Sequence, residues 1–268
     1  MFYIVVSDLD GTLLSPEFNL TEYTKRIIRK LVNKGIYFVI STGRHYKEAI
    51  KIKNNLNISC FLITSNGARI YNLKNKLIYS CDIDSKIVQG IINKYFLDKE
   101  VSIQLYTHEN WYINKENYKV PLSYFLSSFR SKKLELKHLS KKNVSKIFFV
   151  CKNLDKLLFI RKDILNNWND FLSLSFSSQV CLEVMSKFVS KGYALKYITN
   201  ILGLTLKDCI SFGDGENDKE MLEISGKGCI VYNGCDILKN SLPNLEIIGS
   251  NKHDSVAEYL NDVYSLNK

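Results

Sequence analysis

The stretch FYIVVSDLDGTLL, residues 2–14, decides how the rest of the chain is interpreted. Residues 2–6 are apolar and mostly β-branched or aromatic, which is typical of a strand buried on both faces. The polarity then changes abruptly at Asp8, Asp10, Gly11 and Thr12. Since open α/β sheets bind ligands at the carboxyl ends of their strands, this change predicts a functional site directly after the first strand.

Asp8 and Asp10 flank Leu9, so in an extended segment both carboxylates point to the same side. Two carboxylates that lie close together repel each other unless a cation or a proton lies between them. The pair therefore favours a hard, oxygen-seeking metal such as Mg²⁺. Gly11 lets the backbone turn away after them. The alternative interpretation is that Asp-Gly simply closes a surface turn.

A second strand with a polar carboxyl end follows, so that strand, helix and strand lie within about 40 residues. We expect a helix over residues 21–33 with Thr21 as its N-cap, then a buried strand over residues 36–40, which runs into the tetrapeptide STGR at 41–44. In such a βαβ unit the two strand ends lie side by side. The Thr42 hydroxyl and the Gly43 amide, at the start of the next helix, can hold phosphate oxygens. The alternative is an ordinary helix cap.

Two further strand ends continue the pattern. Residues 60–64 form a third expected strand, and Asn66 just beyond it is a candidate contact at the same edge of the sheet. A later strand over residues 209–212 runs into GDGEND at 213–218, where two glycines present Asp214 in a tight loop. Before it, Ser190 is expected to cap a helix that begins with Lys191 and runs to about 202. A lysine in a first helical turn is more often solvated than functional.

The middle of the chain has a different order of expected helices and strands. We expect helices over residues 84–96, 122–129 and 154–168, and strands over 101–107, 111–114, 146–151, 174–178 and 181–185. Antiparallel strands with helices indicate an α+β domain inserted between two halves of a parallel sheet. The predicted domains are residues 1–82 with 188–268, and the insert 83–187.

Composition limits the function classes. The chain has 268 residues, a net charge of +10 and seven cysteines without a CxxC pair. The cysteines lie mostly in apolar runs, which indicates buried reduced thiols rather than disulfides or a zinc site. Lysines are spread along the chain, and only residues 131–146 resemble a basic patch, so we expect no nucleic-acid partner. No apolar run approaches a membrane span or a signal sequence, so we expect no membrane association and a cytoplasmic location.

Taken together, DLDGTLL, STGR, Lys191 and GDGEND resemble, in order, the four motifs of the haloacid dehalogenase (HAD) superfamily. The resemblance extends through ITSNGAR at 63–69, VSKIFF at 144–149, CLEVM at 181–185 and GKGCI at 226–230 to the Cof-type phosphatases, in particular an enterobacterial branch that dephosphorylates pyridoxal phosphate and hexose phosphates. It implies a Rossmann-like α/β core with a parallel sheet and an inserted type IIB α+β cap. Residues 115–142 match weakly, and Ser255 stands where the family often has Gly.

The resemblance also implies a mechanism and a role for each residue. Asp8 would be the nucleophile that forms an aspartyl-phosphate, and Asp10 the general acid and base. Mg²⁺ would be held by Asp8, Asp10, Asp214 and Asp218. Phosphate and substrate contacts would come from Leu9, Thr42, Gly43, Asn66, Lys191 and Asn217.

The four motifs contact only the phosphate group of a substrate. Discrimination between substrates therefore has to come from the cap, residues 83–187. Its candidate residues are Gln104, Tyr106, His108, Trp111 and Glu183, with the aromatic ones expected to stack a flat ring such as pyridoxal. The expected partner is a small phosphorylated metabolite, with no obligate protein partner. Two alternatives remain: a phosphomutase such as a phosphomannomutase, which shares DxDGT, and a basic binding protein without catalysis.

Overall fold

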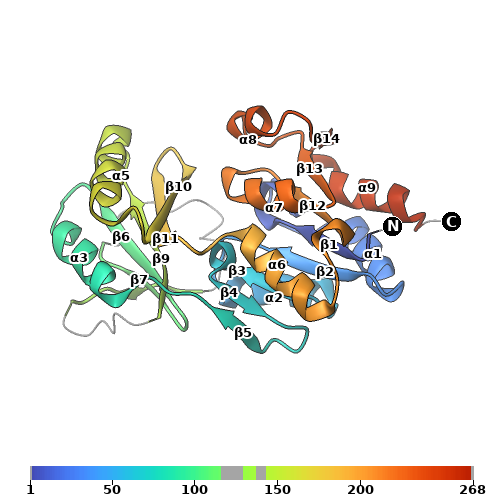
Figure 1. The fold of residues 1–268 in the computed structure, drawn as a ribbon, viewed down its shortest axis with the longest axis horizontal. Helices are drawn as coiled ribbons and strands as arrows, with labels where there is room; N and C mark the ends of the chain where they lie inside the picture. The colour runs from blue at the N-terminus through green and yellow to red at the C-terminus, as the bar shows by residue number, and fades with distance from the viewer. Residues whose placement is uncertain (1, 116–128, 137–142, 267–268) are drawn as a thin grey trace. The chain divides into compact units, whose positions relative to one another are not determined.

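The computed structural model describes residues 2–115, 129–136 and 143–266. The chain forms two compact units (Figure 1). We call Met1–Tyr79 together with Ser190–Lys268 the core unit, and Ser80–Val189 the insert unit. From the sequence these boundaries were expected after residues 82 and 187. The two units are described one after the other.

The core unit is built on a sheet in the order β14-β13-β12-β1-β2-β3-β4-β5. From β14 to β3 the neighbouring strands run parallel, and β4 pairs antiparallel with β3. The strands are β1 (Ile4–Ser7), β2 (Tyr37–Ser41), β3 (Phe61–Thr64), β4 (Arg69–Tyr71), β5 (Leu77–Ser80), β12 (Cys209–Gly213), β13 (Lys227–Val231) and β14 (Glu246–Ile248). The first strand therefore begins two residues later than expected and includes Ser7.

Helices cover both faces of this sheet. They are α1 (Glu22–Asn33), α2 (Tyr46–Leu56), α6 (Lys191–Leu202), α7 (Lys219–Ile224), α8 (Asp236–Ser241) and α9 (Ser255–Tyr264). Along β1, Val5 belongs to the apolar cluster with α1 and α9, whereas Ile4 and Val6 belong to the cluster with α6. Alternate residues of a strand point to opposite faces, so a continuous apolar run is what a strand covered on both sides requires.

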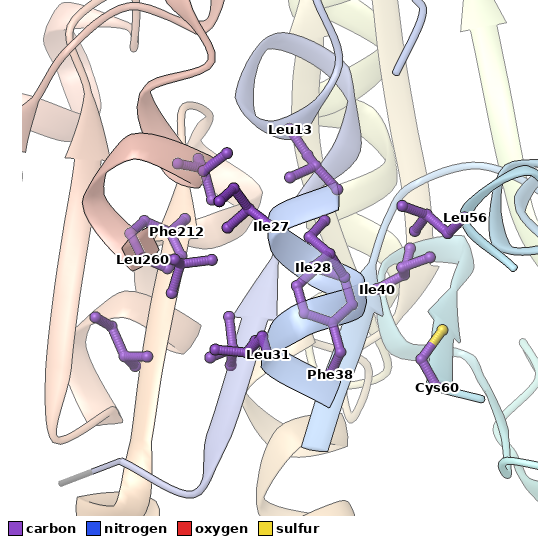
Figure 2. Packing of buried hydrophobic residues seen from close by; sticks show 14 of the residues in the cluster. Leu13, Ile27, Ile28, Leu31, Phe38, Ile40, Leu56, Cys60, Phe212 and Leu260 are labelled. Atoms are coloured by element: carbon purple, nitrogen blue, oxygen red, sulfur yellow. The ribbon is translucent and has the colours of Figure 1, made fainter. Parts of the chain in front are cut away.

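Helix α1 shows how this core packs. Figure 2 shows its residues Ile27, Ile28 and Leu31 gathered near Phe38 and Ile40 of β2. All five side chains are fully buried. Burial of each such side chain contributes about 1.5–3 kcal/mol relative to exposure to water.

The insert unit is an antiparallel sheet with helices on one face. Its strands lie in the order β10-β11-β9-β6-β7-β8, and among the described pairs only β7 and β8 run parallel. The strands are β6 (Ser102–Thr107), β7 (Trp111–Ile113), β8 (Lys132–Lys133), β9 (Val144–Val150), β10 (Leu172–Ser178) and β11 (Cys181–Ser186), and the helices are α3 (Ser85–Tyr95) and α5 (Leu154–Trp168). The helix expected at 122–129 falls, apart from Phe129, outside the described residues.

This architecture confirms the expected fold class, a mainly parallel α/β core with an α+β insert. Helix α8 and strand β8 were not expected. All seven cysteines are free thiols, five of them buried, while Cys235 is exposed. None of the helices described here has the length and apolar character needed to cross a membrane.

Candidate active site

The polar strand ends meet at one edge of the core sheet. Strands β12, β1, β2 and β3 are consecutive neighbours, and their carboxyl ends carry Asp214, Asp8, Thr42 and Asn66 in that order. Because neighbouring parallel strands share direction, four segments far apart in the sequence deliver their side chains to one place. The sheet topology thus brings the predicted polar strand ends together.

Three carboxylates form the centre of this site. One oxygen atom from each of Asp8, Asp214 and Asp218 lies within 4.8 Å of the other two. Burial raises the pKa of Asp8 well above its usual value; the Lys191 ammonium opposes this effect, and the charges of Asp218 and Asp214 add to it. Burial, with the charge of Asp218, raises the pKa of Asp214 to about 7. The cluster therefore holds negative charge that is only partly compensated.

Lys191 supplies that partial compensation. Its Nζ donates to Oδ1 of Asp8 and to Oδ1 of Asp218, both at 2.6 Å. The side chain is fully buried. Burial alone would lower its pKa, but the charges of Asp218 and Asp8 outweigh burial and raise the pKa above the ordinary value. Ser190 caps α6 by accepting the Tyr193 amide, so the first residue of the helix is held at the carboxylates.

Asp218 also shapes the loop in which Asp214 lies. Its Oδ2 accepts the backbone amides of Asp214 and Gly215, each at 3.0 Å, while its Oδ1 accepts Lys191. Both oxygens of Asp218 thus already have donors. Oδ2 of Asp8 and Oδ2 of Asp214, in contrast, accept no hydrogen bond from any residue that the structure describes. A cation at this cluster could therefore contact these two oxygens.

Asp10 is not one of the three clustered carboxylates. Arg44 donates to it through Nε at 2.7 Å and Nη2 at 2.5 Å, a two-point ion pair. These bonds and the charge of Asp10 raise the pKa of Arg44, although its burial alone would lower that pKa. The strand ends at Ser7, and the chain turns tightly over Leu9–Leu13, so the alternation of an extended strand does not continue to Asp10. The structure brings Asp8, Asp214 and Asp218 together and pairs Asp10 with Arg44.

The expected phosphate contacts occupy the neighbouring strand ends. Thr42 is buried, and its Oγ1 accepts the amide of Arg44 at 3.1 Å. Gly43 follows it. Asn217 donates from Nδ2 to Oδ1 of Asn66 at 3.1 Å, so these two amides form a pair. The Leu9 side chain lies in the apolar core, so only its backbone is available to a ligand.

Asn66 is held in an unusual backbone conformation. Ser65 and Asn66 both have positive φ, 50° and 57°, in the turn Ser65–Gly67. A Cβ atom on Gly67 would lie 2.2 Å from the backbone oxygen of Ser190, so the turn packs directly against the start of α6. Non-glycine residues in this region carry strain that the surrounding structure has to offset.

Three residues of the site had no role in the sequence interpretation. Arg44 pairs with Asp10, Thr12 donates to Oδ1 of Asp214 at 2.9 Å, and Asn233 donates to the backbone oxygen of Gly11 at 2.7 Å. Arg44 and Thr12 are part of the quoted motifs, so their presence there was a usable signal. Asn233 is in no motif.

The insert unit brings four of its five candidate residues together. Tyr106 pairs with Trp111 in the β6–β7 register, and Gln104 and Glu183 both lie opposite Phe148 of β9, so their side chains share one face of the sheet. His108 lies at the hairpin tip, where its Nε2 is 3.3 Å from Oε1 of Glu109. It does not join the other four.

Comparisons with known proteins identify a family of similar sequences. Residues 5–260 match the model of a family described as haloacid dehalogenase-like hydrolase. A protein of Buchnera aphidicola subsp. Baizongia pistaciae, provisionally named as a phosphatase, is 61% identical over 264 residues, which cover 98% of this chain and 99% of that protein. An HMP-PP phosphatase of Escherichia coli O6:H1 is 33% identical over 260 residues, which cover 97% and 95%. The crystal structure of a haloacid dehalogenase-like hydrolase from Bacteroides thetaiotaomicron superposes with a TM-score of 0.87 at 21% identity, with 98% of this chain and 100% of that chain covered.

Proposed function

This chain belongs to the haloacid dehalogenase-like hydrolases, and on that premise we propose that it is a Mg²⁺-dependent phosphatase of small phosphomonoesters. The observation that supports this best is the position of Lys191 between Asp8 and Asp218, inside a cluster of three carboxylates at the strand ends. A buried lysine beside a carboxylate nucleophile offsets the charge of an incoming phosphate. The named relatives support the same reaction class.

The carboxylate cluster fits a hard divalent cation. It offers only oxygen ligands, and its burial raises the pKa values of Asp8 and Asp214, so a cation that binds the ionised forms would be stabilising. Asp8 and Asp214 would hold Mg²⁺ through the oxygens that accept no hydrogen bond, with the backbone oxygen of Asp10 as a further ligand. When bound, Mg²⁺ supplies positive charge to the phosphate oxygens.

The first step is an in-line attack of the Asp8 carboxylate on phosphorus. The bond to the leaving alkoxide breaks as the aspartyl-phosphate forms, and Asp10 gives the alkoxide a proton. Lys191, Thr42, Gly43 and Asn217 offset charge on the remaining phosphate oxygens. In the structure Arg44 holds Asp10, and we expect this contact to loosen when Asp10 transfers the proton.

In the second step water hydrolyses the aspartyl-phosphate. Asp10, now ionised, takes a proton from the water, whose oxygen attacks phosphorus; inorganic phosphate leaves and Asp8 is restored. Asp218 serves as support: it holds Lys191 and the loop that carries Asp214.

In this proposal the insert unit selects the substrate. We include pyridoxal phosphate and hexose 6-phosphates as substrates because the sequence resembles phosphatases of that kind. A relative that is 33% identical is named an HMP-PP phosphatase, so we add HMP-PP, a diphosphate ester, as a further candidate beside the monoesters.

The test is release of inorganic phosphate from these esters by the purified full chain, with Mg²⁺ and after chelation by EDTA. We expect turnover that EDTA abolishes and Mg²⁺ restores. Replacing Asp8→Asn should lower kcat more than about 100-fold, because an amide cannot act as the nucleophile. The matched control is Asp262→Asn, an exposed position on α9.

The outcomes separate the alternatives. Phosphoryl transfer to a second sugar without free phosphate would indicate a phosphomutase. No turnover of any ester, together with retarded migration of nucleic acid in a gel, would indicate a basic binding protein.

A further inference from the structure

The turn that carries Asp10 has a glycine directly after this residue. Asp10 has φ −77° and ψ 119°, and Gly11 has φ 82° and ψ −10°, which are the angles of the two central residues of a type II turn. A Cβ atom on Gly11 would overlap Oδ2 of Asp214, so no larger residue fits there. Because glycine has the widest backbone freedom of all residues, the backbone beside Asp10 needs a restraint from outside the turn.

Asn233, in the loop after β13, supplies such a restraint. Its Nδ2 donates to the backbone oxygen of Gly11 at 2.7 Å. Its Oδ1 accepts the backbone amide of Asn251 at 2.9 Å and the hydroxyl of Ser250 at 3.3 Å. Both ends of the side-chain amide are therefore engaged, and the contacts to Oδ1 direct the Nδ2 donor at Gly11.

The rest of the turn is held from the same part of the chain. Nδ2 of Asn251 donates to the backbone oxygen of Leu14 at 2.8 Å, and Thr12 donates to Oδ1 of Asp214 at 2.9 Å. All of these residues belong to the core unit. Residues from the loops after β12, β13 and β14 thus fix the backbone that follows Asp10 at three points.

Stability of the fold is a weak reason for the contact between Asn233 and Gly11. Asn233 is exposed, and a hydrogen bond at the surface contributes little to stability because water can replace either partner. Proton transfer sets a stricter requirement, since a general acid has to lie within hydrogen-bond reach of the leaving oxygen. Once the contact between Asp10 and Arg44 loosens, the backbone beside Asp10 has to keep its carboxyl group in place.

We propose that Asn233 is a positioning residue for proton transfer by Asp10. It restrains Gly11, so the carboxyl group of Asp10 keeps its place when Arg44 releases it. Asn233 acts through the backbone of Gly11 and does not itself contact the substrate. This inference rests on the proposed phosphatase function, in which Asp10 protonates the leaving alkoxide.

The experiment compares two leaving groups that differ in their need for a proton. p-Nitrophenoxide is a stable anion near neutral pH and can leave p-nitrophenyl phosphate unprotonated, whereas the alkoxide of benzyl phosphate has to be protonated as it leaves. The ratio of kcat/KM for benzyl phosphate to kcat/KM for p-nitrophenyl phosphate therefore measures proton donation. Departure of the alcohol is irreversible at initial rates, so hydrolysis of the aspartyl-phosphate does not enter either kcat/KM.

The decisive variant is Asn233→Asp. It keeps an acceptor for Asn251 and Ser250 but places an oxygen where the donor to Gly11 was. We expect the ratio of the two kcat/KM values to fall at least about fivefold, which is part of the roughly 100-fold or larger contribution of a general acid. The Tm should stay near that of the wild type, because the contacts within the loops remain.

Two further variants serve as second test and control. Asn233→Ala adds no charge and removes the same donor, so it should lower the ratio by a similar factor. Asn244→Asp makes the same chemical change at an exposed position between α8 and β14, and it should keep the wild-type ratio. Asp10→Asn removes the acid itself and sets the largest fall in the ratio that can be expected. Circular dichroism verifies the folding of each variant.

The outcomes separate this inference from the proposed function. If Asp10→Asn lowers the ratio but folded Asn233→Asp and Asn233→Ala leave it unchanged, or lose activity equally on both esters, Asn233 does not position the acid. Loss of folding in both Asn233 variants would assign this residue to stability and would equally overturn the inference. An unchanged ratio in Asp10→Asn, or no phosphate release by the wild-type chain from either ester, would overturn the proposed mechanism together with the inference.

Discussion

Asp10 and Arg44 show that the sequence predicted the positions of single residues better than their contact partners. Asp8 and Asp214 lie directly after buried strands β1 and β12, as the apolar runs before them predicted. Lys191 begins helix α6, and Asp218 ends the turn Glu216–Asp218. Which partner Asp10 takes depends on the turn over Leu9–Leu13, whose course no side-chain pattern determines.

Asn233 was not predictable for a different reason. It holds the backbone oxygen of Gly11 from 222 residues away and accepts the amide of Asn251. A contact of this kind arises only when β13 lies in its place in the sheet, and neither periodicity nor spacing around Asn233 marks it.

The first residue-scale prediction concerns Asn66. Asn66→Gly keeps a left-handed backbone available but removes the acceptor of Asn217, so kcat/KM should fall about five- to tenfold, the effect of one lost hydrogen bond. Asn66→Ala should lose activity by a similar factor and, in addition, about 1 kcal/mol of unfolding free energy, because alanine is strained at φ 57°. Phosphate-release kinetics and urea denaturation measure the two effects.

The matched control is Asn57→Gly, at the left-handed C-cap of α2. It shares the backbone conformation and lies outside the site, so its kinetics should stay at wild-type values. Full activity in Asn66→Gly would show that the amide pair does not position Asn217.

Among the elements, the long helices and buried strands were predictable and the shortest ones were not. The residue pattern predicted α1, α3, α5 and α6, and Thr21 and Ser190 cap their helices as expected. Helix α8 spans Asp236–Ser241 and β8 only Lys132–Lys133, too few residues for a repeat to be recognised. Their formation depends on the surfaces against which they pack.

The element-scale prediction concerns the start of α1. Oγ1 of Thr21 accepts the amide of Thr24 at 3.0 Å and donates to Oδ1 of Asp254 at 2.8 Å. Thr21→Ala removes both bonds and should lower the unfolding free energy by about 1–2 kcal/mol, as measured by urea denaturation. Thr21→Ser keeps both and should lie within about 0.5 kcal/mol of wild type. Equal destabilisation by Ala and Ser would assign the effect to the lost methyl group.

At the scale of the whole molecule, the carboxylate cluster links stability to pH and to metal. Burial raises the pKa of Asp214 from 3.8 to about 7, and raises that of Asp8 as well. Between pH 3.8 and about pH 7, Asp214 keeps its proton in the folded, metal-free chain but has released it in the unfolded chain. The unfolding free energy therefore decreases as pH rises through this range. A cation that binds the ionised carboxylates opposes this loss.

We therefore expect Mg²⁺ to raise the Tm more at about pH 8 than at about pH 5.5, because protons compete with the metal at the lower pH. Thermal denaturation with MgCl₂ or EDTA measures the difference. Asp214→Asn should remove most of the pH dependence of this Mg²⁺ effect. An equal rise at both pH values would place the bound metal away from these carboxylates.

The pairing of β1 with both β2 and β12 has a consequence for the order of folding during synthesis. Ile4 lies opposite Tyr37 on one side and opposite Cys209 on the other. A growing chain can join β1, β2 and β3 early, and the continuous insert can fold as a unit when it emerges. Until residue 218 has been made, however, Asp8 stands at an open sheet edge without Lys191, Asp214 and Asp218. The incomplete chain therefore lacks the proposed active site until these residues have been made. Before then, the unpaired edge of β1 is the place where we expect a chaperone or a wrong strand to bind first.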